Sequence, residues 1–460
     1  MIDTTENVRN NTSKYFKEPL EREWFRKVGL AYMFSLYVLP QYFGIANPLF
    51  DLTIVRITII VAAIFIINDK ERTASFKQII VTEKMGLVLI PYFIVLFYTM
   101  VLRVDFNAFL NPFIEFLEMY LLIYIIRDTF GFKQSVKIFL GFIYLLVILG
   151  VIESITSVSP FSYLVTIKGI YTGRYLRGGH YRIMSNAGHS LGYGLMLITA
   201  LPFAAYDYEK EELNIFRRPV LLGLLLFNIF MTGSRSTLGV ALGEIFAMFL
   251  LSDFKYIKHN TMLLLSSFTI FAFLTFVLQK TSFGSYVMLQ ITSLVDSLFD
   301  TTYSVKYGAN LQQLRQSKAY RDLLKRIFHV EWLNPILGIG RKRGFKSMVD
   351  GRRIVSIDNF YIAEYVRYAY PGMVSYILFL VYMGVRMAYD IYKTHSAAIR
   401  MCFIGTAFYC LHLYIADSLQ TFKYLYVLFA LYLCVDKKEY VPAKDPCKYI
   451  KRGIIEYAKL

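Results

Sequence analysis

Long apolar runs separated by short polar segments recur along nearly the whole chain. Met85–Leu102 and Thr261–Gln279 are examples, and each is close to the roughly 18 apolar residues that span a bilayer. An open sheet would leave backbone groups unpaired in hydrocarbon, so we expect these runs to be helices. The pattern predicts an all-α integral membrane protein with about twelve transmembrane helices, near residues 29–45, 53–68, 86–103, 109–126, 136–154, 189–206, 219–233, 236–252, 261–279, 371–388, 399–415 and 421–435.

The same pattern divides the chain into segments. The first stretch is polar and has no short apolar run ending in small residues, so we expect no cleaved signal peptide. The expected organisation is a cytoplasmic N-terminal segment (1–28), helices one to nine with an outer loop at 156–188 (29–279), a large outer loop domain between spans nine and ten (280–370), helices ten to twelve (371–435) and a basic cytoplasmic tail (436–460).

The composition of the chain agrees with this organisation, and the distribution of basic residues predicts how the chain is oriented in the membrane. The chain is 56% hydrophobic and only 18% charged, whereas soluble domains carry about 25% charged residues, which argues against a soluble domain. Lysine and arginine gather in alternate loops, such as 69–85 and 207–218, and in the tail. The positive-inside rule then predicts that both termini are cytoplasmic.

Two segments on the expected outer side break that rule. Residues 156–188 carry four basic residues and no acidic one, and residues 280–370 carry 14 Lys or Arg against 7 Asp or Glu. An anionic, lipid-linked substrate would explain basic charge there, because guanidinium groups bind phosphate oxygens at two points. Solvated basic loops near anionic headgroups are the alternative interpretation.

Ionisable residues inside the expected spans lie in the outer half of the membrane. Arg56, Glu115 and Glu118 lie at similar depth, and Glu153 ends the fifth span. Such groups are costly in hydrocarbon and are usually functional or paired. For the first three we favour a buried scaffold ion pair over direct catalysis.

Arg235 lies in a different setting, a tight turn rich in Gly and Ser between two apolar runs, Thr232–Ser236. A helix start with backbone donors and a guanidinium together suits a pyrophosphate. No Gly-rich nucleotide loop and no His/Cys cluster with ligand spacing occurs, so we expect neither a metal nor a nucleotide site. The net charge of +17 is interpreted as membrane topology rather than nucleic-acid binding.

Four short motifs resemble those of a known family. Met231–Thr237 resembles the Ser-Arg signature of the O-antigen polymerase and ligase superfamily of bacterial membrane glycosyltransferases. Three further stretches agree in kind and order: Arg182 followed by Asn186, Gly188, Gly192 and Gly194; Arg321 followed by Asn334–Gly340 and Phe345; and Asp358–Tyr361 leading to Tyr370-Pro371-Gly372. Together they cover roughly residues 170–390.

The resemblance implies a polysaccharide polymerase of the bacterial cytoplasmic (inner) membrane. Its substrates would be a polyprenyl-pyrophosphate-linked glycan as donor and a second lipid-linked repeat unit as acceptor, with no cofactor, and a chain-length regulator protein is a candidate partner. The product would be O-antigen, capsule or exopolysaccharide.

Two alternative functions stay open. In ligases of this superfamily the residue before the motif's Asn is usually His, and Asp358 here favours a polymerase. A lipid-linked oligosaccharide flippase or transporter is the other.

These motifs supply the candidate site. For the pyrophosphate we nominate four arginines, Arg182, Arg235, Arg321 and, in reserve, Arg177. For the general base that takes the proton of the acceptor hydroxyl we nominate Asp358, with His189 second. An N-cap or Asx turn is the structural alternative for Asp358. We expect the run Arg341–Arg343 to be a solvated basic loop, with phosphate binding as the alternative interpretation.

Overall fold

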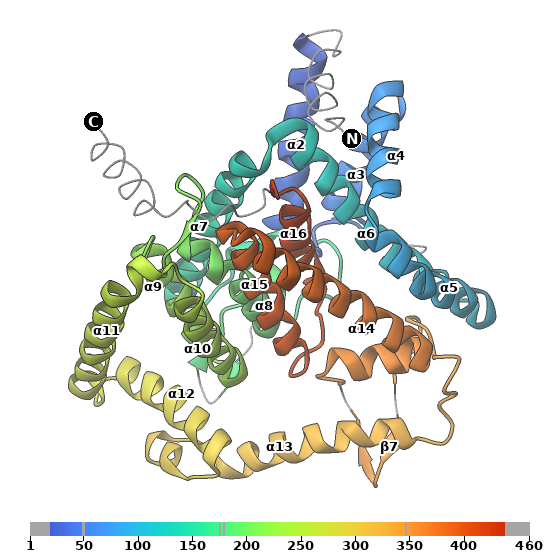
Figure 1. Ribbon diagram of the computed structural model, residues 1–460. Helices are drawn as coiled ribbons and strands as arrows, with labels where there is room; N and C mark the ends of the chain where they lie inside the picture. The colour runs from blue at the N-terminus through green and yellow to red at the C-terminus, as the bar shows by residue number, and fades with distance from the viewer. Residues whose placement is uncertain are drawn as a thin grey trace, which may run out of the picture.

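The computed structural model describes residues 19–47, 51–173, 176–177, 180–345, 347–354 and 356–437. It confirms an almost wholly helical chain (Figure 1). In the described part, strands form only short antiparallel hairpins, β1 (Gly44–Ile45) with β2 (Leu52–Thr53), β3 (Leu176–Arg177) with β4 (His180–Tyr181), β5 (Tyr206–Asp207) with β6 (Glu212–Leu213), and β7 (Met348–Val349) with β8 (Arg352–Arg353).

Each of the twelve expected apolar runs overlaps a helix. By length and composition, five helical stretches within the described residues can cross a membrane: α5 (Met85–Arg103), α6 with its π-helical end (Phe106–Phe130), α7 (Phe132–Thr156), α11 with its short lead-in (Phe254–Leu278) and α14 (Phe360–Thr394). The shorter apolar helices are α3 (Ile54–Ile67), α8 (Ser190–Ala205), α9 (Pro219–Met231), α15 (Ala397–Leu413) and α16 (Phe422–Leu433). The remaining helices are α2 (Pro19–Tyr37), α4 (Lys70–Thr82), α10 (Arg235–Leu250), α12 (Ser282–Phe299) and α13 (Leu311–Lys325).

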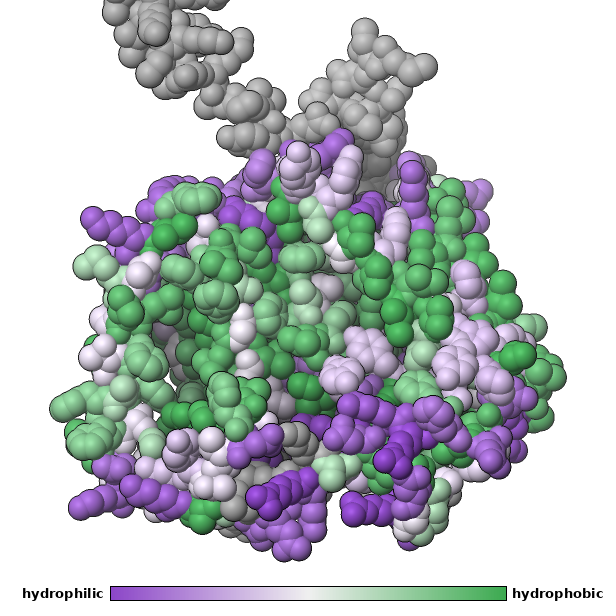
Figure 2. Space-filling model, turned by 60° about the horizontal axis from the view of Figure 1, so that its bottom comes forward, coloured by the Kyte–Doolittle hydropathy of each residue, from purple (hydrophilic) through white to green (hydrophobic). Residues whose placement is uncertain are grey.

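The outside of the bundle is apolar where a soluble protein would be polar. On α11, Phe268, Phe273 and Phe276 are each between 65% and 71% exposed. Figure 2 shows an apolar band between two hydrophilic rims. Contiguous exposed apolar surface of this extent marks a surface that contacts lipid or another protein, and together with the apolar helices it identifies a membrane protein.

Two of the short apolar helices, α8 and α16, are enclosed by the rest of the bundle, whereas the longer helices α5 and α11 lie at its periphery. Almost every residue of α8 and every residue of α16 is buried, whereas α5 and α11 expose much of their surface. A helix enclosed by other helices does not have to match the thickness of the lipid, because protein surrounds it along its length. The burial pattern therefore accounts for the short length of α8 and α16.

The loops gather at two opposite edges of the bundle (Figure 1). At one edge, which we call the α12–α13 edge, Tyr42 accepts from the backbone of Ile167, Ile183 donates to Met231, and Phe360 donates to Ala416. This edge also holds α12, α13 and hairpin β7–β8.

At the opposite edge, which we call the α4 edge, Glu83 pairs with Arg127 and with Arg386, and Asp253 pairs with Arg400. In these contacts, loops that the charge pattern assigned to the outer side lie together at the α12–α13 edge, and loops that it assigned to the cytoplasm lie together at the α4 edge.

A break in α14 explains the motif Asn334–Gly340. Ala369 has φ +57°, and Pro371 has no N–H to donate, so the carbonyls of Val366 and Arg367 lose their helical partners. The N–H groups of Ile339 and Gly340 donate to these two carbonyls instead, and Tyr370 donates to Pro335. The motif therefore clamps the large loop onto the start of α14.

Candidate functional site

Arg182 is held in place by a buried carboxylate at the end of α7. Both oxygens of Glu153 accept hydrogen bonds, from the Tyr181 hydroxyl at 2.8 Å and from the backbone N–H groups of Met184 at 2.9 Å and Ser185 at 2.8 Å. Glu153 therefore fixes the strand-like segment on both sides of Arg182. Glu153 lies in the last turn of α7, and its structural role is to position this loop.

Arg182 packs directly against the Ser-Arg turn. Its Nε donates to the carbonyl of Thr232 at 2.6 Å, and the side chain is only 3% exposed. Gly233 has φ +60°, and a Cβ there would lie 3.0 Å from the hydroxyl of Tyr286 and 3.2 Å from Nε of Arg182. Only glycine suits this close approach. Two motifs that are fifty residues apart in sequence thus form one surface.

Arg235 is the first residue of α10, and hydroxyl groups surround that helix end. Ser234 is the N-cap and accepts from the backbone of Thr237. The hydroxyl of Thr237 donates to Ser234 and is 2.8 Å from Nε2 of His412, a buried residue of α15. The positive end of the helix dipole adds to the Arg235 guanidinium, so this corner favours an anion. Sequence reasoning missed His412, whose only signal was a histidine within an apolar run.

His189 is the N-cap of α8. Its Nδ1 accepts from the backbone N–H of Leu191 at 3.1 Å, so in the neutral ring the proton is on Nε2. Burial lowers the pKa of His189, the positive charge of Arg182 lowers it further, and the negative charge of Asp358 acts in the opposite direction. Because Nδ1 is occupied by the helix backbone, His189 is suited to donate a hydrogen bond from Nε2 rather than to accept a proton.

Asp358 is not the cap of α14. Asn359 is the N-cap, with its side chain accepting from Ile362 at 3.1 Å and donating to Tyr414 at 2.8 Å. The hydroxyl of Ser356 donates to Asp358 at 2.9 Å. The structural alternative for Asp358 as N-cap is therefore wrong, because the side chain that caps α14 is that of Asn359 and the contact of the Asp358 carboxylate is with Ser356.

Arg321 reaches the same region from α13. It is exposed, and its positive charge acts on His412, beneath the Ser-Arg turn. The reserve residue Arg177 lies on β3, but its side chain is outside the described residues. Of the six nominated side chains, the structure thus brings Arg182, Arg235, Arg321, His189 and Asp358 to the α12–α13 edge.

Arg341, a loop residue that was expected to be solvated, is the partner of Glu115, one of the ionisable residues expected within the membrane. Glu115 pairs with Arg341 at 3.7 Å. Arg341 was expected in a solvated loop; instead its Nε donates to Tyr368, and its side chain is only 22% exposed. Burial lowers the pKa of Arg341, but Tyr368 and Glu115 more than offset this and hold its pKa above the usual value.

Arg56 has partners close to itself in sequence and space. It donates to the carbonyl of Asp51 at 2.6 Å and to the side chain of Asn111 at 2.7 Å. Glu118 lies near enough to Arg56 and Lys423 for their charges to act on it. These contacts fit the expected scaffold role for Arg56, Glu115 and Glu118.

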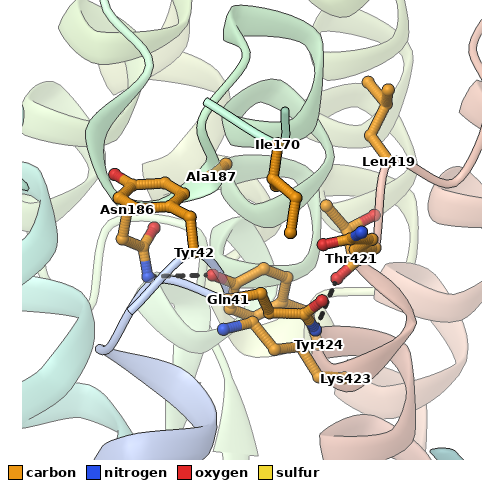
Figure 3. Close-up of a pocket in the computed structure, with 10 residues that line it drawn as sticks. Gln41, Tyr42, Ile170, Asn186, Ala187, Leu419, Thr421, Lys423 and Tyr424 are labelled. Atoms are coloured by element: carbon orange, nitrogen blue, oxygen red, sulfur yellow. Dashed lines mark hydrogen bonds between the residues drawn. The ribbon is translucent and has the colours of Figure 1, made fainter. Parts of the chain in front are cut away.

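A small cavity lies between the start of α16 and the loop before α8, next to the motif residue Asn186 (Figure 3). Asn186 donates to the hydroxyl of Tyr424 and to the carbonyls of Tyr37 and Val38. The cavity has a volume of about 10 Å³, room for one water molecule and not for a sugar. The motif residue Asn186 is therefore structural.

The sequence matches no protein-family model and no curated protein. Within the described residues, no group of three or more His, Cys, Asp or Glu side chains is placed to hold a metal ion.

Proposed function

We propose that the protein is a polysaccharide polymerase that joins polyprenyl-pyrophosphate-linked repeat units on the outer face of the bacterial cytoplasmic membrane. One observation carries the proposal. Arg182, the turn Ser234–Arg235, His189 and Asp358 come from three separate stretches of the chain and meet at the α12–α13 edge. Cationic groups for the departing pyrophosphate and a carboxylate for the acceptor hydroxyl are what transfer from a pyrophosphate to a hydroxyl requires.

The proposed reaction uses each of these groups. The acceptor hydroxyl attacks the anomeric carbon of the donor glycan, and the bond from that carbon to the pyrophosphate oxygen breaks. The bonding electron pair leaves with the pyrophosphate, where Arg182, Arg235 and the N-terminus of α10 meet the developing charge. Asp358 takes the proton of the hydroxyl. Nε2 of His189 donates to a substrate oxygen or to Asp358 and orients it.

The proposed topology has twelve crossings, formed by α2, α3, α5–α11 and α14–α16, with α4 along the cytoplasmic surface. Two observations support it. The polar contacts sort the loops into the α12–α13 edge and the α4 edge, and the apolar band lies between two hydrophilic rims (Figure 2). Both termini would then be cytoplasmic, and the candidate site would face outward.

The test is chain elongation by the purified protein in lipid nanodiscs, supplied with one defined polyprenyl-pyrophosphate oligosaccharide. We expect products of increasing length from the wild type. Arg235→Lys should lose most of this activity, because an ammonium cannot make the two-point contact of a guanidinium. Arg352→Lys, an exposed arginine of β8 outside the site, is the matched control and should elongate normally.

Three outcomes would contradict the proposal. If the wild type only moves the unextended unit across the bilayer of a vesicle, the protein is a flippase. If it transfers the glycan to a lipid acceptor that carries no repeat unit, it is a ligase. If Arg235→Lys elongates as well as Arg352→Lys, then Arg235 is not a pyrophosphate ligand.

A further inference from the structure

A second cavity, larger than that of Figure 3, lies next to Asp358. Its volume is about 570 Å³, within the usual range for small-molecule sites. It is lined by Ile339–Arg341 and Arg343–Phe345, by Arg353, Ile354, Ser356 and Ile357, by Ala363, Val366 and Arg367 of α14, and by Asp417. Ser356, which donates to Asp358, lines it. The cavity therefore adjoins the proposed general base, on residues that the pyrophosphate corner does not use.

Four arginines and one aspartate supply the charge of this cavity. They are Arg341, Arg343, Arg353, Arg367 and Asp417, which gives a formal net charge of +3. Arg367 is fixed by Asp417 at 2.6 Å and by Glu364 at 3.2 Å, so its guanidinium is pre-positioned. Arg343 and Arg353 are exposed and, among the described residues, pair with no carboxylate. Two guanidinium groups are thus open to an anionic ligand.

Apolar side chains form much of the remaining wall. They include Ile339, Phe345, Ile354, Ile357 and Val366. The ring of Phe345 stacks on Trp332 with centroids 5.5 Å apart and an angle of 19° between the planes. A sugar ring has an apolar C–H face and a polar rim, so it suits a wall of this mixed kind. A bare pyrophosphate has no apolar face and would gain nothing from it.

We propose that this cavity binds an acidic sugar of the acceptor glycan, with its carboxylate held by Arg343 and Arg353. This rests on the proposed function, because the sugar would place its hydroxyl, or that of its neighbour, beside Asp358. It also goes further, since it predicts that the repeat unit carries a uronic acid or another carboxylate-bearing sugar. Paired guanidinium groups favour a carboxylate through charge-assisted hydrogen bonds.

The test measures binding to the purified full-length protein in nanodiscs. The probe is a hexasaccharide of alternating glucuronic acid and N-acetylhexosamine, compared with the same oligosaccharide after its carboxylates are reduced to alcohols. We expect the acidic probe to bind and the reduced probe to bind at least about tenfold more weakly, the factor for roughly 1.4 kcal/mol.

Variants assign the binding to the cavity. Arg343→Gln and Arg353→Gln should each weaken binding of the acidic probe about tenfold. Arg352→Gln, the neighbouring arginine on β8 that does not line the cavity, is the matched control and should bind like the wild type. Inorganic pyrophosphate should not displace the probe.

Two results would overturn the proposal. Equal binding of the acidic and reduced probes would remove the role of the carboxylate. Full displacement by inorganic pyrophosphate would make the cavity a phosphate site. Neither result touches the proposed polymerase, because elongation is measured separately with the lipid-linked donor. Conversely, if the protein binds the acidic probe but does not elongate the lipid-linked donor, the sugar-binding role of the cavity is supported and the proposed polymerase activity is contradicted.

Discussion

At the scale of single residues, Asp358 is the most direct test of the chemistry. Asp358→Asn keeps the shape of the side chain and can still accept the hydrogen bond from Ser356, but it cannot take a proton. Elongation should fall by roughly two to four orders of magnitude, the size of a general-base contribution, while binding of the lipid-linked donor persists. Asp322→Asn on α13 is an exposed control that should elongate normally.

Normal elongation by Asp358→Asn would mean that another group takes the proton. His189 could not simply replace it, because Nδ1 already accepts from Leu191. The residue to change next would then be Glu115, the carboxylate that pairs with Arg341.

Single residues also show where sequence reasoning succeeds and where it stops. Arg182, Arg235 and Asp358 could be nominated because each belongs to a short motif that is visible in one stretch of sequence. The burial of Arg341 could not be predicted, because its partners Glu115 and Tyr368 lie on other helices. Such pairings depend on tertiary packing, which local patterns do not contain.

At the scale of elements, apolar helices were predictable and polar ones were not. The segment 69–85 was expected to be a loop but contains α4, whose N-cap Asp69 accepts from the backbone of Glu71 and Arg72. Similarly, α12 and α13 lie in the expected loop domain. Twelve apolar runs gave a clear signal, whereas α4 is polar and its cap residue was the one local clue.

The clamp on α14 gives a prediction at this scale. A Cβ on Gly338 would lie 2.1 Å from the carbonyl oxygen of Arg367, and neither backbone can move without losing the hydrogen bonds of Ile339 and Gly340. Gly338→Ala should therefore destabilise the protein by about 3 kcal/mol, the upper end for overpacking. The measurement is the thermal unfolding midpoint of the purified protein.

Gly344 provides the control for this prediction. It lies in the same loop, and a Cβ there would meet nothing within 4 Å. Gly344→Ala should leave the unfolding midpoint unchanged. Equal midpoints for the two variants would show that the clamp does not constrain α14.

At the scale of the whole molecule, the two most completely buried helices, α8 and α16, are also short. By its rise per residue, the buried helix α8, with 16 residues, is about 24 Å long, less than the roughly 30 Å of a hydrocarbon core. The exposed helices α5 and α11 are longer. Sequence length alone would rank α8 as a weak candidate to cross. Its position at the centre of the bundle supports its inclusion, because protein rather than lipid surrounds it.

The number of crossings can be tested through parity. Lys77 lies on α4 and Lys306 follows α12, and both lysines are exposed. Seven of the proposed crossings, α5–α11, lie between them, and α12 is not proposed to cross. If all seven cross, an odd number of crossings places the two residues on opposite sides. In intact cells stripped of their outer layers, a membrane-impermeant maleimide should label Lys306→Cys, and should label Lys77→Cys only after permeabilisation. The wild type, whose described cysteines Cys402, Cys410 and Cys434 are at least partly buried, gives the background.

Labelling of both variants from the same side would mean that one of the short helices, α8, α9 or α10, does not cross. The loop assignments would then change with it, and if α10 were that helix, Asp358 and Arg235 would no longer share one face of the membrane.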